Sequence, residues 1–291
     1  METSELIKKV RKIEIKTRGL SKQLFSGEYH SAFKGRGMAF SEVREYFPGD
    51  EIRTIDWNVT ARSGTPHIKV FEEERELTVM LIVDISGSEN FGTQTLFKRE
   101  LITELCAVIA FSAMQNNDKV GLILFSDQIE KFIPPKKGKS HVLRIIRELI
   151  EFKAKSKKTN IDSAVRYFSN VVKKRSIAFI LSDFIDDNFE QSLKIASRKH
   201  DTVAIKVYDK SETEVPNLGL VQLKDFETGK FKWVDTSSKK FREEFKKWWT
   251  ESQVELEQTL LKNKIDLISI STDESYIAPL QQFFKRREGR K

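Results

Sequence analysis

The chain has 291 residues, of which 39% are hydrophobic and 32% charged, and its formal net charge is +8. A chain of this length buries a substantial core, so it is too long for a bare binding module, and we expect one main domain with an appendage. Its single cysteine, Cys106, excludes an internal disulfide or cysteine zinc site. No stretch has the ~18 apolar residues of a membrane span, and residues 1–12 lack the apolar run of a signal peptide. We therefore expect a cytoplasmic protein.

Residues 1–76 differ in pattern from the rest of the chain. The first part predicts one basic helix over 1–25, and the glycines and prolines beyond it predict turns and short strands. No linker rich in Pro, Gly or Ser follows this part. We therefore expect residues 1–76 to pack on a main domain formed by residues 77–291.

From about Thr78 the chain alternates apolar strands with amphipathic helices, which predicts a doubly wound α/β fold with a mostly parallel sheet. Strands are expected over 78–83, 120–125, 176–181, 202–207 and 265–270. Helices are expected over 95–115, 140–152, 161–173, 189–198 and 238–263. Residues 128–133, closed by two prolines, predict an antiparallel edge strand, and 226–231 predict a hairpin tip.

Polar residues fall where these strands and helices meet the loops. Asp84, Ser86 and Ser88 follow the first apolar strand, Thr159 opens a helix, and Asp183 closes a later strand. Ligands in open α/β sheets bind at the carboxyl ends of the strands. Two carboxylates and three hydroxyls suit Mg²⁺ or Mn²⁺, and the lack of Cys and His argues against zinc.

The same residues also have an ordinary structural interpretation. Asp, Ser and Thr are favoured as helix caps and in turns, so each could serve the backbone alone. If they do hold a cation, only Asp84 and Asp183 bring negative charge to it. The cation would then keep net positive character and an open coordination position, and we expect it to attract an external carboxylate.

The D-x-S-x-S at Asp84, Ser86 and Ser88, the T-x-x-x-x-A that starts at Thr159 and the strand-terminal Asp183 resemble the metal-ion-dependent adhesion site of von Willebrand factor A domains. The resemblance implies that these five residues hold the divalent cation. It also implies a Rossmann-type fold.

The segment 40–62 closely resembles the signature of a bacterial family, domain-of-unknown-function family 58, whose members join it to a von Willebrand A-like domain. The resemblance spans about residues 30–210. Genes of this family commonly neighbour MoxR-type AAA+ ATPases, which implies a role as adaptor or co-chaperone for such an ATPase. Many members carry membrane spans, so peripheral association with membrane complexes stays open. The signature residues in this chain are Arg44, Tyr46, Gly49, Asp50, Asp56, Trp57 and Arg62.

Charge is concentrated in the signature and in one later stretch. The alternating signs of the signature suit an ion-paired network that ties this segment to the main domain, and a partner surface is the alternative. Residues 131–158 hold ten Lys or Arg against two Glu, a net of +8 by subtraction. A solvated face is the ordinary explanation. The lysines nearest Thr159 are candidates for a rim that attracts an acidic partner, and they are Lys153, Lys155, Lys157 and Lys158.

We therefore expect a non-enzymatic protein that binds an acidic residue of a protein partner through a divalent cation. One alternative is a metal-dependent phosphoryl hydrolase, which would need more convergent carboxylates. A second is nucleic-acid binding through residues 131–158. The groove-reading motifs of that class are absent from the sequence, so nucleic acid is not the expected partner.

Overall fold

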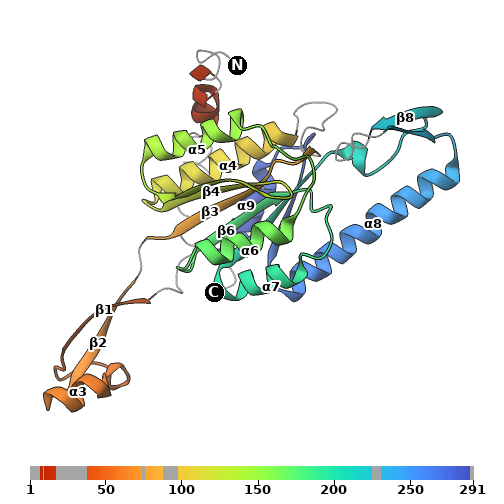
Figure 1. Cartoon of the computed structure of the whole chain (residues 1–291). Helices are drawn as coiled ribbons and strands as arrows, with labels where there is room; N and C mark the ends of the chain where they lie inside the picture. The colour runs from red at the N-terminus through yellow and green to blue at the C-terminus, as the bar shows by residue number, and fades with distance from the viewer. Residues whose placement is uncertain are drawn as a thin grey trace. The chain divides into compact units, whose positions relative to one another are not determined.

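The computed structural model describes residues 7–8, 10–17, 38–73, 76–87, 98–224 and 231–288 (Figure 1). The chain divides into two compact units. Phe33–Leu77 forms one, here called the signature unit, and Met1–Ala32 together with Thr78–Lys291 forms the other, called the sheet unit. This differs from the predicted division into 1–76 and 77–291, because the first 32 residues group with the sheet unit. Packing of the signature unit on the sheet unit stays a prediction.

Ion pairs link the N-terminal residues to the sheet unit. Residues 7–8 and 10–17 are helical, and the rest of the helix predicted over 1–25 lies outside the described residues. The Lys16 ammonium lies 2.8 and 2.6 Å from the two carboxylate oxygens of Glu104. Lys139 lies 2.6 Å from Glu14. These pairs hold the N-terminal helix on α4 (Lys98–Gln115) and α5 (Lys139–Glu151).

A six-stranded sheet forms the centre of the sheet unit, in the order β10-β7-β6-β3-β4-β5. Neighbouring strands are parallel except for β4 and β5, which are antiparallel. The predicted doubly wound fold, with a mostly parallel sheet and one antiparallel edge strand, is confirmed. The strands are β3 (Thr78–Asp84), β4 (Lys119–Phe125), β5 (Ile129–Lys136), β6 (Ile177–Ser182), β7 (Asp201–Tyr208) and β10 (Asp266–Ser271).

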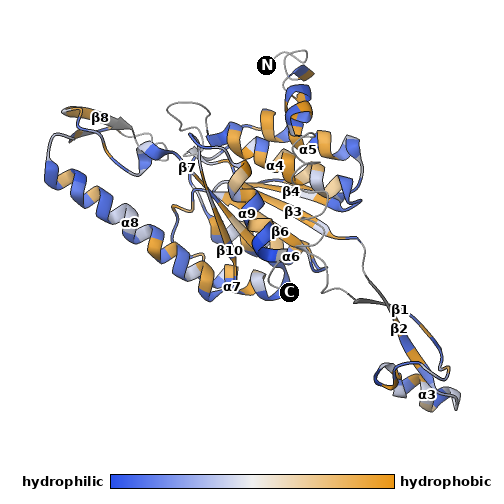
Figure 2. Cartoon of the chain, turned by 180° about the vertical axis from the view of Figure 1, so that it is seen from behind, coloured by the Kyte–Doolittle hydropathy of each residue, from blue (hydrophilic) through white to orange (hydrophobic). Residues whose placement is uncertain are grey.

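Helices cover both faces of this sheet, with α4 and α5 on one face and α6 and α7 on the other (Figure 1). The central strand β3 is buried on both faces, as parallel strands between helices are, and the strands are correspondingly hydrophobic (Figure 2). No helix in the described ranges has the length and apolarity to cross a membrane. The remaining helices of the sheet unit are α6 (Ile161–Val171), α7 (Glu190–Lys199), α8 (Lys239–Lys262), α9 (Ile277–Glu288) and the short η3 (Lys210–Glu212).

The helix α4 is apolar on nearly all sides. Every residue from Leu101 to Ala113 is buried. Cys106 lies within this stretch, and burial raises the pKa of its thiol. Cys106 is therefore buried, as predicted, and α4 packs in the interior of the sheet unit.

Two regions outside the six-stranded sheet contain antiparallel strand pairs. In the sheet unit, β8 (Leu220–Lys224) pairs with β9 (Phe231–Asp235), and the predicted tip over 226–231 lies outside the described residues up to Phe231. The signature unit pairs β1 (Met38–Glu45) with β2 (His67–Glu73) and adds η1 (Ile52–Thr54) and α3 (Trp57–Ser63). The short strands predicted for the N-terminal part are confirmed.

Candidate metal centre

The strands β3 and β6 lie side by side in the middle of the sheet, and polar residues stand at their ends. The order of the strands places β4 and β5 beyond β3, and β7 and β10 beyond β6, so the chain changes direction at this pair. Such a switch point leaves a crevice at the carboxyl ends of the strands. Asp84 is the last residue of β3, and Asp183 directly follows β6. Because Val83 pairs with Leu181, the two strand ends are level.

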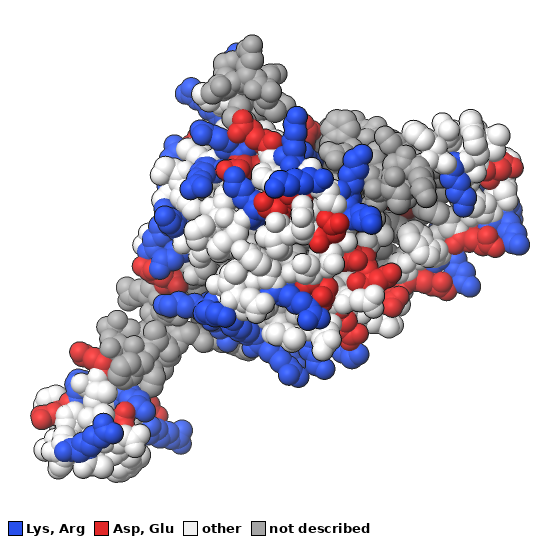
Figure 3. Space-filling model, in the orientation of Figure 1, with Lys and Arg blue, Asp and Glu red and all other residues white. Residues whose placement is uncertain are grey.

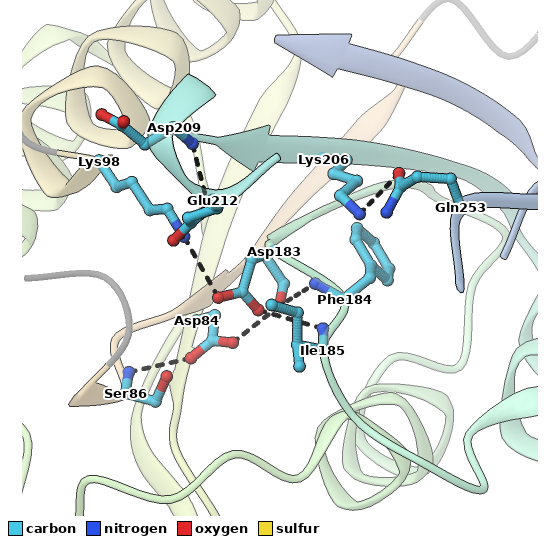
Figure 4. A network of polar contacts seen from close by, with 11 residues as sticks. Asp84, Ser86, Lys98, Asp183, Phe184, Ile185, Lys206, Asp209, Glu212 and Gln253 are labelled. Carbon is cyan, nitrogen blue, oxygen red and sulfur yellow. Dashed lines mark hydrogen bonds and ion pairs between the residues drawn. The ribbon is translucent and has the colours of Figure 1, made fainter. Parts of the chain in front are cut away.

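The Asp84 carboxylate is 1% exposed and accepts hydrogen bonds on both oxygens (Figure 4). Oδ1 accepts from the backbone N–H of Ser86 at 2.9 Å, and Oδ2 accepts from the hydroxyl of Ser182 at 2.7 Å. These bonds fix the direction of the carboxylate. A carboxylate oxygen has about two acceptor sites, so both oxygens can still coordinate a cation.

The Asp183 carboxylate, also 1% exposed, faces the same place from β6. Its Oδ1 accepts from the N–H of Ile185 at 3.2 Å, and its Oδ2 lies 3.4 Å from the ammonium of Lys98. Phe184, between Asp183 and Ile185 in the chain, has a φ of 57°, a left-handed conformation that is uncommon for an aromatic residue. This turn folds the backbone back, so that the N–H of Ile185 reaches Asp183.

Two charged residues beside Asp183 were missed by the sequence interpretation. Lys98, in the first turn of α4, has a fully buried side chain, and its Nζ lies 2.6 Å from Oε1 of Glu212 in η3. A sequence signal for Lys98 did exist, because it shares one helix face with Leu101 and Leu105 and so belongs to an apolar stripe. Glu212 lies outside every helix and strand predicted from the sequence, so it offered no comparable signal.

Burial shifts the protonation of the groups at this edge. Burial, and then the nearby charge of Asp183, raise the pKa of Asp84 to about 7. Burial also raises the pKa of Glu212 and lowers the pKa of a second buried lysine, Lys206, to about 8. Groups shifted in this way by burial and a charged neighbour are typical of functional sites.

The predicted hydroxyl ligands come from two loops that meet. Ser86 is buried next to Asp84, whereas Ser88 lies outside the described residues. Thr159 is half-buried in the loop before α6. This loop adjoins the loop after β3, because the N–H of Gly87 donates to the carbonyl of Lys157 at 2.9 Å.

The oxygen donors fit a hard divalent cation. Asp84 and Asp183 are two buried carboxylates whose negative charges oppose each other, and the Ser86 hydroxyl adjoins them. Carboxylate and hydroxyl oxygens are ligands that Mg²⁺ and Mn²⁺ accept. Within the described ranges, His, Cys, Asp and Glu side chains form no group of three or more that could hold a metal. A cation here would therefore depend on hydroxyls and water as well as on the two carboxylates.

The four lysines predicted to form a rim are all exposed, in the loop between α5 and α6. They are Lys153, Lys155, Lys157 and Lys158. The rest of the basic stretch includes ion pairs, such as Lys131 with Glu148 at 2.9 Å. Acidic and basic side chains are interspersed over the visible face of the molecule, as a solvated face would be (Figure 3).

In the signature unit, the first charged pair closes a tight turn. The guanidinium of Arg44 binds both oxygens of Asp50, at 2.7 and 2.8 Å, and Asp50 also accepts from the N–H of Phe47 at 2.8 Å. Gly49 lies inside this turn with a φ of 110°, which side chains rarely allow. The turn therefore needs both the ion pair and the glycine.

The second part of the signature forms α3. Asp56 caps this helix by accepting from the N–H groups of Asn58 and Val59, and Lys69 lies 3.3 Å from it. Charge pairs are thus present within the unit, whereas the network expected to tie this segment to the main domain stays a prediction. The other signature residues are half-buried Tyr46, exposed Arg62 and Trp57, which is 70% exposed.

Proteins of similar sequence occur in mycobacteria and in Bacillus. Uncharacterized protein Rv1480 of Mycobacterium tuberculosis strain H37Rv is 27% identical over 294 residues, covering 99% of this chain and 92% of that protein. Uncharacterized protein YeaD of Bacillus subtilis strain 168 is 28% identical over 109 residues, covering 38% of this chain and 25% of YeaD.

Similar solved structures include the conserved hypothetical protein BatB of Bacteroides thetaiotaomicron, with a TM-score of 0.48 and 15% identity over 74% of this chain and all of that chain. Another is the SpRpn10 VWA domain, with a TM-score of 0.38 and 12% identity over 70% of this chain and 93% of that chain. The model of the family "Protein of unknown function DUF58" matches residues 42–255, most of the sequence. The chain therefore belongs to the DUF58 family, as its signature segment predicted.

Proposed function

We propose that this protein is a non-enzymatic, divalent-cation-dependent binding protein. Mg²⁺ or Mn²⁺ would be held at the switch point of the sheet by the residues that the sequence singled out, Asp84, Ser86, Ser88, Thr159 and Asp183. The bound cation would supply an open coordination position for an Asp or Glu of a protein partner. We propose the cytoplasm as its location.

One observation carries the proposal. Asp84 and Asp183 are both 1% exposed, they stand at the ends of adjacent strands, and the charge of one raises the pKa of the other. Two like charges buried together are unfavourable unless cations offset them, and the ammonium of Lys98, 3.4 Å from Asp183, offsets them only in part. A helix cap or a turn residue needs neither this depth of burial nor a second acid.

The small number of carboxylates supports binding over hydrolysis. Two carboxylates just balance the charge of a divalent cation, so its remaining coordination positions are open to hydroxyls, water and one ligand from a partner. Two-metal phosphoryl chemistry uses more acidic ligands, and the described residues bring no such group together. The exposed lysines at 153, 155, 157 and 158 would attract the acidic partner electrostatically.

For the partner itself we propose a MoxR-type AAA+ ATPase, with this protein acting as its adaptor or co-chaperone. The support is the family resemblance of the signature segment. Peripheral association with membrane complexes would follow from the partner, since the described helices do not span a membrane. Nucleic acid is not part of this proposal.

Isothermal titration of Mg²⁺ and of Mn²⁺ into the full chain tests the cation site. We expect one site in the wild type and loss of binding in Asp84→Ala. Asp187→Ala is the matched control, because Asp187 is an exposed acid in the loop after β6. Equal binding by wild type and Asp84→Ala would rule out the site.

Affinity capture from a native lysate, with and without EDTA, tests the partner. We expect an AAA+ ATPase to be retained by the wild type with Mg²⁺ and lost with EDTA or in Asp84→Ala. Identical proteins captured under all three conditions would contradict a cation-dependent interaction.

A further inference from the structure

A buried lysine lies directly beside the candidate metal centre. The side chain of Lys98 is 0% exposed, and it enters from the first turn of α4. Its ammonium stands between Glu212, at 2.6 Å, and Asp183, at 3.4 Å (Figure 4). The lysine therefore shares its charge unequally, with a close contact to Glu212 and a looser one to the acid that we assign to the cation.

The position of Glu212 is set by the backbone around it. Its Oε2 accepts from the N–H of Asp209 at 3.1 Å in a capping box that starts η3, and its Oε1 holds Lys98. Asp209 is fixed in turn, because the hydroxyl of Thr272 donates to it at 2.7 Å. Glu212 is thus a stationary acceptor, whereas the long side chain of Lys98 has several rotatable bonds.

We propose that Lys98 is a built-in competitor of the divalent cation for Asp183. Without the cation, the ammonium neutralises part of the charge of Asp183. When the cation enters, Lys98 gives up Asp183 and keeps Glu212. Lys98 therefore raises the cation concentration at which the site fills. Glu212 limits this effect, because it holds the ammonium away from full contact with Asp183. This inference rests on the cation site proposed above.

A second buried lysine provides a comparison. Lys206 is 2% exposed, but its Nζ donates to Gln253 at 2.8 Å and lies 4.7 Å from the centre of the Trp249 ring. Both partners belong to α8, so Lys206 affects Asp183 only through its field. Loss of Lys206 tests the effect of a nearby charge without direct competition.

The test is titration of Mg²⁺ and Mn²⁺ into four full-length variants and the wild type, with folding checked by circular dichroism. Lys98→Met should bind the cation about tenfold more tightly or better, because one neighbouring charge changes an ionic equilibrium by about one to three powers of ten. Glu212→Gln should bind more weakly, since it removes the carboxylate that draws Lys98 away from Asp183. Lys206→Met should change the affinity less than Lys98→Met does.

The double variant Lys98→Met with Glu212→Gln separates competition from net charge. It has the same net charge as the wild type and leaves no buried carboxylate of the Lys98–Glu212 pair unmatched. Competition predicts tighter binding than in the wild type, whereas an effect of net charge alone predicts wild-type affinity. The double variant and Glu212→Gln also decide the matter if Lys98→Met does not fold.

Each result is decisive. Cation binding by the wild type with the same affinity in the double variant overturns the inference and leaves the proposed cation site standing. Weaker binding in all variants shows that Lys98 is structural, which also overturns it. Binding by the double variant but not by the wild type supports the inference and removes the proposed function from the wild-type protein. Binding by neither overturns both.

Discussion

Both units of the protein contain charged pairs, but burial gives them opposite characters. In the signature unit, the guanidinium of Arg44 lowers the pKa of Asp50 to about 2, so this acid is better ionised in the fold than outside it. In the sheet unit, burial and the charge of Asp183 raise the pKa of Asp84 to about 7, so this acid is worse ionised in the fold.

The Arg44–Asp50 pair therefore stabilises the fold, whereas the cluster around Asp84 and Asp183 destabilises it. The Arg44–Asp50 pair closes a turn and is complete by itself. The cluster around Asp84 and Asp183 keeps a conflict of charge, although two lysines are buried nearby. Conflicts of this kind concentrate at functional sites.

The largest effect is expected from Asp84→Asn without added metal. The pKa of Asp84 is raised from 3.8 to about 7, so its contribution to stability is complete below about pH 4 and is lost as the pH rises through 7. At pH 8 the variant should be more stable than the wild type, on the order of a few kcal/mol. Denaturant melts at pH 8 measure this difference.

Addition of Mg²⁺ should reverse this order, because a ligand that binds only the native state stabilises it. The wild type should melt at higher temperature with Mg²⁺, and Asp84→Asn should not respond. If Asp84 is only a cap or a turn residue, the variant loses stability at every pH and Mg²⁺ changes neither protein.

A smaller effect is expected at His200, which is 2% exposed and contacts Phe168 with tilted rings whose centroids are 4.4 Å apart. Burial lowers the pKa of His200 from 6.5 to about 4, so its contribution is present above pH 6.5 and is lost as the pH falls toward 4. His200→Phe should reduce this acid sensitivity. Melts across pH 4–7 would show parallel curves for the two proteins if His200 stayed neutral in both states.

Lys206→Met tests whether a buried lysine lowers the free energy of unfolding of the sheet unit. Burial lowers the pKa of Lys206 from 10.5 to about 8, so below pH 8 the fold carries the cost of charging it, and that cost disappears as the pH rises to 10.5. We expect the variant to gain about 1 kcal/mol at pH 7, as buried ions replaced by apolar groups often do, and to gain nothing above pH 10.5. Lys153→Met, at an exposed position, is the control and should change nothing.

The smallest effect is expected from Asp50→Asn in the signature unit. The Arg44 ion pair is complete above about pH 4 and is lost as the pH falls through 2. The main unfolding transition should stay unchanged in the variant, since the pair lies in the smaller unit. The amide of Phe47, which donates to Asp50 at 2.8 Å, should exchange faster with solvent. A large drop in the main transition would show that the pair supports more than its own turn.

The sheet and the pairing of its strand-end acids could be predicted from the sequence. Continuous apolar runs such as Val79–Val83 show where buried parallel strands lie, and residues after such strands meet at one edge. The edge position of β5 was indicated by its prolines, and its antiparallel direction by the short connection from β4. These features depend on local pattern and on the few topologies open to an α/β chain.

The charges that complete the site could not be predicted in the same way. Lys98 could be placed on the apolar face of a helix, but a lysine is almost never fully buried without a partner. That partner, Glu212, lies more than a hundred positions away in the short η3. The extent of the two units was also missed at the N-terminus. There, long-range contacts such as the ion pair of Lys16 with Glu104, which no local pattern indicates, link the N-terminal helix to the sheet unit.

The hydrogen bond from Ser182 to Asp84 joins residues 98 positions apart. Contacts of such long range form late, because the chain must first lose the entropy of closing a large loop. During synthesis, β3 emerges well before β6, so Asp84 at its end has no neighbouring Asp183 until β6 has paired with β3. A partner that recognises a cation at this edge would therefore recognise only chains whose central sheet has closed.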